Sequence, residues 1–109
     1  RPYKDVGESR RPTLTFPREV PFKSQGPSDV VAMAEDNLKW LQTSADVPKL
    51  YIEADPGAAN DTMGPIAKAL PNLKKEVVKG LHFIQEDSPD EIGQFISQFL
   101  KDQVEGMKL

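Results

Sequence analysis

KEVVKGLHFIQEDSPDEIGQFISQFL, residues 75–100, is the stretch that decides the fold. It opens with a short β-branched run, and the single histidine of the chain, His82, follows shortly after that run. A helix is predicted next, because Ser88 can act as its N-cap, Pro89 suits the first helical position and Glu91 can complete a capping box. The apolar residues beyond it have helical spacing and predict one face packed on a core: Ile92, Phe95, Ile96, Phe99 and Leu100. His82 is therefore expected in a loop leaving a strand, which is where α/β folds bind ligands.

The composition predicts one small acidic unit of 109 residues, with 38% hydrophobic residues, a net charge of −3 and a pI near 5.1. This charge gives no basic face for nucleic acid or anionic lipid. Without cysteine, and with one histidine, the chain has no thiol nucleophile and no zinc-ligand cluster, so we expect no metal and no other cofactor. No apolar run approaches the roughly 20 residues of a membrane span. We expect a soluble, cytoplasmic protein that binds neither nucleic acid nor membrane.

The chain starts without methionine in a polar, proline-containing stretch, as an internal fragment of a longer protein would. Residues 1–27 hold five prolines, which predict an extended arm with little regular structure. The apolar residues of this arm are too many for a disordered linker and predict that it packs against something: Leu14, Phe16, Val20 and Phe22.

The remaining pattern alternates helices and strands. Helices are predicted over residues 28–42, 62–70 and 88–103, and strands over residues 49–53 and 75–78. The strand, helix, strand succession predicts a right-handed βαβ unit with a parallel strand pair. Such a pair needs further strands beside it, so a larger sheet is expected outside the chain.

Asp55 follows the first predicted strand and His82 the second, so a carboxylate and an imidazole are expected at the same rim of the sheet. That arrangement suits an acid that orients a general base. Both residues can instead be structural, because Asp-Pro-Gly is also an ordinary turn and a lone histidine often has no catalytic role. Glu86 and Asp87 are expected to complement the dipole of the last helix. The chain has no G-x-S-x-G elbow, and alone it is expected to be inactive.

Four segments resemble the C-terminal third of haloalkane dehalogenases and of Renilla-type coelenterazine luciferases: GLHFIQEDSPDEIG (residues 80–93), RRPTLTFPREVP (10–21), SDVVAMAEDNLKWL (28–41) and VPKLYIEADPG (47–57). The resemblance implies an α/β fold class, namely the C-terminal portion of an α/β-hydrolase. Residues 1–21 would then end the helical cap. Residues 22–109 would supply the C-terminal part of the core, with the last two parallel strands and their flanking helices.

The resemblance also implies roles for individual residues. In this family an aspartate forms an alkyl-enzyme ester, and a histidine, here His82, activates the water that hydrolyses it. The nucleophile, the oxyanion-hole amides and the halide-binding residues would lie outside the chain, and Trp40 matches none of them. The sequence is more similar to the subfamilies whose acid follows the preceding strand, so Asp55 would be a turn residue and the acid an upstream glutamate. The implied pocket residues, for which ordinary packing is the alternative, are Pro17, Val20, Ala58, Ala59 and Phe83.

Three functions are weighed. The first is a dehalogenase that cleaves carbon–halogen bonds of small apolar haloalkanes, assembled with the missing N-terminal portion of the fold. The second is a luciferase that oxidises coelenterazine with O2, without a cofactor. Segments 51–55 and 78–83 are closer to the luciferase branch, but luciferases of this type resemble one another in carrying bulky aromatics where Ala58 and Ala59 stand, which favours the dehalogenase. The third is a non-catalytic fragment or interaction module.

Overall fold

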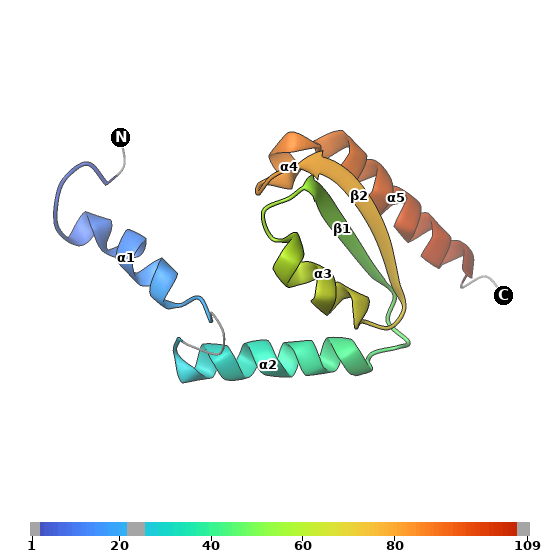
Figure 1. Ribbon diagram of the computed structural model, residues 1–109, viewed down its shortest axis with the longest axis horizontal. Coiled ribbons are helices and arrows are strands. Elements are labelled where there is room, and N and C mark those ends of the chain that lie inside the picture. Colours follow the sequence, from blue (N-terminus) through green and yellow to red (C-terminus); the bar gives the residue numbers. More distant parts are fainter. Residues whose placement is uncertain (1–2, 22–25, 107–109) are drawn as a thin grey trace. The chain divides into compact units, whose positions relative to one another are not determined.

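The computed structural model describes residues 3–21 and 26–106 (Figure 1). The chain divides into two compact units, Arg1–Trp40 and Leu41–Leu109, with the division falling inside a helix. The candidate chemistry of residues 54–88 belongs to the second unit.

The first unit contains the short 3-10 helix η1 (Glu8–Arg10), the helix α1 (Arg11–Arg18) and most of α2 (Ser28–Thr43). The extended arm predicted for residues 1–27 is wrong at Arg11–Arg18, which form the helix α1. Pro12 lies in the first turn, where its missing N–H costs no hydrogen bond, and the helix ends directly after Pro17. Of the arm residues, Pro2 and Phe22 lie outside the described residues.

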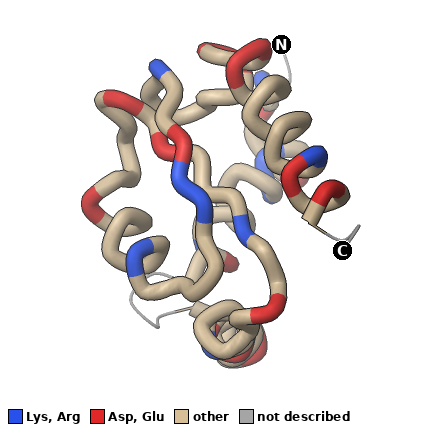
Figure 2. The backbone as a smooth tube through the Cα atoms, turned by 90° about the vertical axis from the view of Figure 1, so that its right-hand side faces the viewer, with Lys and Arg blue, Asp and Glu red and all other residues tan. Residues whose placement is uncertain are grey.

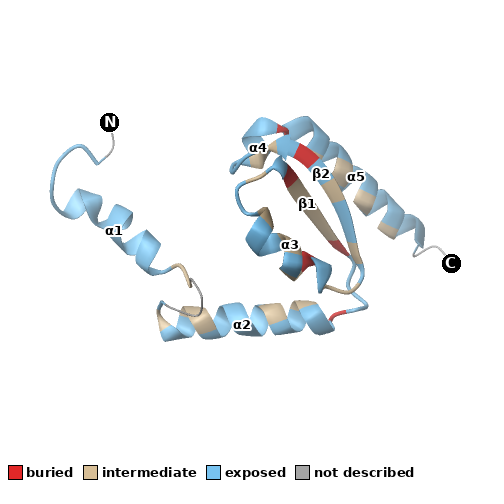
Figure 3. Ribbon diagram, viewed as in Figure 1, coloured by how far each residue is buried: buried red, intermediate tan, exposed pale blue. Residues whose placement is uncertain are grey.

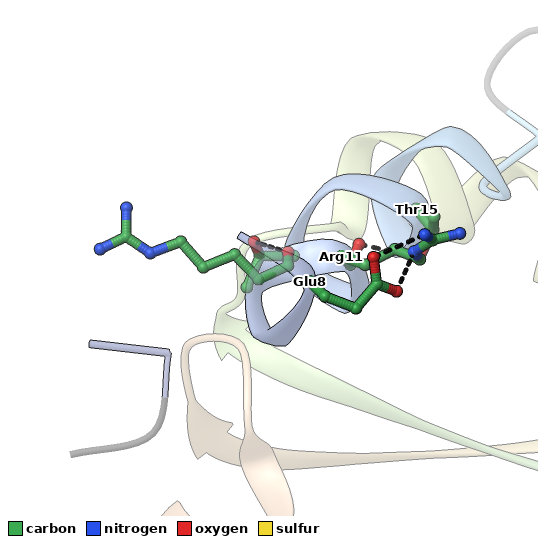
Figure 4. A network of polar contacts seen from close by, with 5 residues as sticks. Glu8, Arg11 and Thr15 are labelled. Carbon is green, nitrogen blue, oxygen red and sulfur yellow. Dashed lines mark hydrogen bonds and ion pairs between the residues drawn. The ribbon is translucent and has the colours of Figure 1, made fainter. Parts of the chain in front are cut away.

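Polar contacts hold η1 and α1 together (Figure 4). Glu8 of η1 pairs with the guanidinium of Arg11 of α1 at 2.5 Å, and within α1 the hydroxyl of Thr15 donates to the carbonyl of Arg11. Both partners of the ion pair are largely exposed, so it contributes little to stability. Leu14 and Phe16 are 54% and 73% exposed, and the packing expected for these arm residues stays a prediction.

The second unit follows the predicted succession. It contains β1 (Lys49–Pro56), α3 (Asn60–Lys68), β2 (Leu73–Gly80), α4 (Ile84–Asp87) and α5 (Pro89–Gly106). The two strands pair in parallel, with a register that runs from Lys49 opposite Leu73 to Pro56 opposite Gly80. The parallel pair and its connecting helix are confirmed. The strands are longer than predicted, and the turn helix α4 was not predicted.

The strand pair lies between two helices, α3 against β1 and α5 against both strands (Figure 1). The core between them is small. Among the described residues only three apolar side chains are buried, Ala54, Ala67 and Val78, and no large side chain is fully buried (Figure 3). The sheet-facing residues of α5, such as Phe95 and Phe99, are half-buried.

A buried lysine ties the amino end of the strand pair together. Lys49 is 9% exposed, and its Nζ donates to the carbonyls of Ser44 (2.5 Å), Val47 (2.8 Å) and Pro71 (3.1 Å). A buried ammonium group needs all three of its donors satisfied. The contacts join the turn before β1 to the turn before β2, so Lys49 aligns the start of the strands.

A surface pair links β2 to α5. Lys74 Nζ lies 3.3 Å from Asp102 Oδ2 and 3.4 Å from Glu76 Oε1, and Gln98 donates to the other oxygen of Asp102 at 2.6 Å. The hydrogen bond to Asp102 raises the pKa of Lys74. The hydrogen bonds from Gln98 and then Lys74 lower the pKa of Asp102, so this contact is lost as the pH falls through the folded-state pKa of Asp102.

Charges of both signs are interspersed along the described backbone (Figure 2). No helix in residues 3–21 and 26–106 is long and apolar enough to cross a membrane.

The small core generates a prediction for the isolated chain. Because few apolar side chains are buried while Leu100, Val104 and Val77 are at least half exposed, the 109-residue chain alone should unfold over a broad temperature range. Differential scanning calorimetry measures this. A sharp two-state transition would contradict it and would favour an independent interaction module.

Candidate active site at the carboxyl end of the strand pair

The pairing of β1 and β2 continues beyond the strands themselves. Gly57 N–H donates to the carbonyl of Gly80 at 3.1 Å, and Ala58 N–H donates to the carbonyl of Leu81 at 2.8 Å. The loops that leave the two strands are therefore joined by backbone hydrogen bonds. As a result, the residue before His82 lies at a fixed position beside the residues that follow β1.

The turn after β2 is held from its other side by α4. Asp87 Oδ2 accepts a hydrogen bond from Leu81 N–H at 3.0 Å, and the hydroxyl of the buried Ser88 donates to the carbonyl of Lys79 at 2.7 Å. The carbonyl of Phe83 accepts from Glu86 N–H at 2.8 Å, which closes the single turn of α4. The carbonyl of Ser88 accepts from Ile92 N–H, as expected for the N-cap of α5.

Gly80 makes this close approach possible. Its φ is 157°, and a Cβ added there would lie 2.9 Å from Asp87 Oδ2 and 3.1 Å from Ile84 Cγ2. Real Cβ atoms are not found so close to an oxygen. A side chain at position 80 would therefore force the side chains of Asp87 and Ile84 to shift.

His82 itself is exposed. Its ring contacts the ring of Phe83 edge to face, with centroids 4.8 Å apart and an interplanar angle of 76°. Within the described part of the chain, no hydrogen bond or ion pair occupies the imidazole nitrogens. The backbone on both sides of His82 is thus hydrogen-bonded, while both ring nitrogens can meet groups from outside the chain.

A cavity of about 140 Å³ lies beside His82. It joins three of the predicted site residues, His82, Ala58 and Ala59, whereas Phe83 contacts the His82 ring but does not line the cavity. Its other lining residues come from β1, α3, the turn after β2 and α4: Tyr51, Ile52, Ala54, Asn60, Met63, Leu81 and Ile84. A wider hollow of about 540 Å³ on the first unit contains no predicted site residue.

The other candidates lie elsewhere. Pro17 is exposed in α1, and the half-buried Val20 follows that helix, both in the first unit. Asp55 is an exposed residue of β1 that lies opposite Lys79, and within the described residues it makes no hydrogen bond to His82. An acid–base pair between Asp55 and His82 is therefore not formed within this chain. The described residues also contain no group of three or more side chains that could hold a metal ion.

Sequence reasoning missed two residues of this site. Asn60 Nδ2 donates to the carbonyls of Ala54 (2.7 Å) and Pro56 (3.1 Å), which fixes the start of α3 against the end of β1. Asp87 holds the His82 turn, whereas its position before a helix predicts only a dipole role. Asn60 could have been identified from its residue type, because an Asn or Asp that follows a strand and turn often hydrogen-bonds to the nearby backbone.

Comparison with known proteins gives relatives along nearly the whole chain, although no family model matches it. This chain is 46% identical over 100 residues to coelenterazine h 2-monooxygenase of Renilla reniformis. It is 46% identical over 104 residues to a haloalkane dehalogenase of Mycolicibacterium smegmatis, and 48% identical over 101 residues to a haloalkane dehalogenase of Sphingobium indicum. These matches cover 92%, 94% and 92% of the chain but 32%, 33% and 33% of the relatives. The chain therefore spans about a third of the length of the curated relatives it matches.

Solved structures agree. The crystal structure of DBJA has a TM-score of 0.75 at 32% identity, covering 93% of this chain and 34% of its own. The haloalkane dehalogenase AncHLD2 has a TM-score of 0.73 at 36% identity, covering 86% and 33%. The predicted resemblance is confirmed, and so is the fold class: the chain has the fold of a C-terminal portion of an α/β-hydrolase.

The Gly80 geometry leads to a stability prediction. The test protein, called the chimera below, joins the upstream two thirds of the Sphingobium indicum dehalogenase to residues 1–109 of this chain. Gly80→Ala should lower the free energy of unfolding of the chimera by about 1–3 kcal/mol, because the added Cβ overlaps Asp87. Gly93→Ala, where a Cβ meets nothing within 4 Å, is the matched control and should not destabilise. Equal urea midpoints for both variants would contradict the close approach.

Proposed function

Because this chain is similar to a third of haloalkane dehalogenases and of a coelenterazine monooxygenase, we propose that it supplies the base-bearing C-terminal part of a haloalkane dehalogenase-like hydrolase. The observation that carries the proposal is the position and exposure of His82. Its imidazole is exposed at the carboxyl end of a parallel strand pair, beside a cavity, on a backbone held from both sides. A general base needs this combination of a fixed position and an available nitrogen.

The reaction requires a nucleophile from the upstream part of the fold. An aspartate oxygen there attacks the carbon that bears the halogen, and the carbon–halogen bond breaks with its electron pair leaving as halide. Water then adds to the carbonyl carbon of the ester while His82 takes its proton. Collapse of the adduct breaks the bond between the acyl carbon and the alkyl oxygen, and the alkoxide takes the proton from His82 and leaves as an alcohol. The restored aspartic acid then loses the second proton of the water to solvent and is an aspartate again.

The triad acid is proposed to come from outside this chain. Asp55 lies exposed within β1, opposite Lys79 and without a hydrogen bond to His82 among the described residues, which favours a structural role for it. A glutamate of the upstream part would then orient the imidazole.

The surface of the second unit supports assembly with an upstream part. Ile96, Leu100 and Val104 follow one another at intervals of four residues on α5 and are 44%, 57% and 52% exposed. An apolar stripe of this kind favours burial against another element. The relatives are about three times as long as the segment that matches this chain. In them, the rest of the fold can pack against the surface that corresponds to this stripe. Residues 1–21 would end the cap, and the fragment alone would be inactive.

The luciferase alternative is favoured by the 46% identity to the Renilla enzyme and by segments 51–55 and 78–83, which are closer to that branch. Against it, the side chains of Ala58 and Ala59, which line part of the cavity beside His82, are small. At these two positions they leave room but provide no flat surface to hold a large planar luciferin. We therefore assign the chain to the dehalogenase branch, with a small apolar haloalkane as substrate.

The role of His82 is tested in the chimera. The chimera should release bromide from 1-bromobutane, and His82→Ala should lower its turnover by about 10³-fold or more, because the ester step loses its general base. Circular dichroism checks that the variant is folded. Turnover that survives His82→Ala would refute the role given to this histidine.

A second fusion, to the upstream part of the Renilla reniformis enzyme, separates the two activities. It should emit no light with coelenterazine if the chain belongs to the dehalogenase branch. Light from this fusion together with no bromide release from the chimera would defeat the assignment.

A further inference from the structure

Leu81, the residue before His82, has both of its backbone polar groups engaged. Its N–H donates to Asp87 Oδ2 at 3.0 Å, and its carbonyl accepts from Ala58 N–H at 2.8 Å. On the other side, the carbonyl of Phe83 accepts from Glu86 N–H at 2.8 Å. The position of His82 is therefore set by backbone hydrogen bonds on either side of it.

The hydrogen bonds around this turn differ in kind. Most join backbone to backbone, and another runs from the buried Ser88 hydroxyl to the carbonyl of Lys79. The bond from Leu81 N–H is the one that depends on a charged side chain. A hydrogen bond to a carboxylate is stronger than one between neutral groups, and its loss would free the N–H of the residue directly before His82.

The glycine at position 80 agrees with this role. The Asp87 carboxylate lies so close to Gly80 that a Cβ there would come within 2.9 Å of Oδ2. The glycine, whose φ is 157°, thus leaves room for the carboxylate because it has no Cβ. Glu86, the neighbouring acid, is exposed, and its carboxylate makes no hydrogen bond within the described segment 80–88, so charge near the turn is not by itself sufficient for the contact.

We propose that Asp87 is a positioning residue of the active site: by accepting the Leu81 N–H, it holds the His82 backbone where the imidazole can reach the ester and its water. The inference rests on the proposed function for its effect on catalysis, but the contact itself does not. Asp87 does not touch the imidazole, and its role is to accept a hydrogen bond rather than a proton.

The test compares Asp87→Ala, Asp87→Asn and the control Glu86→Ala in the chimera. Asp87→Ala should speed amide hydrogen exchange at Leu81 by about tenfold or more and lower kcat by about tenfold or more, with KM within about threefold. Asp87→Asn keeps an acceptor oxygen and should restore both values to within about threefold of the parent. Glu86→Ala should change neither.

Each outcome decides. The inference is overturned if Leu81 exchanges equally fast in the parent and in Asp87→Ala, if kcat does not follow the exchange rate, or if Asp87→Asn is as impaired as Asp87→Ala. A parent chimera that releases no bromide defeats the proposed function and, with it, the catalytic half of this inference. The holding contact is then still decided by the exchange rates alone.

Discussion

The structure depends on the continuation of parallel pairing past the ends of β1 and β2. The hydrogen bond from Ala58 N–H to the carbonyl of Leu81 joins two loops that would otherwise diverge. Because the strands are parallel, both loops leave at the same edge, so this one bond brings the two alanines of the first loop and the histidine of the second to one cavity. Strand register therefore decides which residues meet at the site.

The packing around this edge is uneven. The amino end of the strand pair is held by the three carbonyls that surround Lys49 Nζ, and the carboxyl end by Asn60, Asp87 and Ser88. Between these two sets of hydrogen bonds, the buried apolar core of the described residues consists of small side chains, while α5 exposes a stripe of larger ones. Local geometry at the histidine is thus well determined by polar contacts, whereas the apolar surface is suited to burial by a larger fold. A chain that spans a third of its relatives' length is consistent with this division.

Much of the second unit could be predicted from sequence, because its helices and strands follow strong periodic patterns. The strands are predicted from a β-branched run and from a stretch that ends at the Asp-Pro-Gly turn, and α5 from its N-cap and helical spacing. The predicted ends of these elements and of α3 differ from the structure by at most three residues. The prediction for α1 was wrong because Pro12 falls in a first turn, where proline is tolerated, and because Pro17 lies inside the helix one residue before its end. The short helix α4 is too brief to produce a periodic signal. Since Asp87 reaches Leu81 only through the turn that α4 makes, no pattern in the sequence could predict that contact.

The most direct test of the account is the fate of the enzyme ester when His82 cannot act as a base. Intact-mass spectrometry of the chimera carrying His82→Gln, after incubation with 1-bromobutane, should show a stable increase equal to one butyl group, with one equivalent of bromide released, because alkylation needs no base and hydrolysis does. An unmodified mass accompanied by continuing bromide release would contradict the account, since the ester would then be hydrolysed without this histidine.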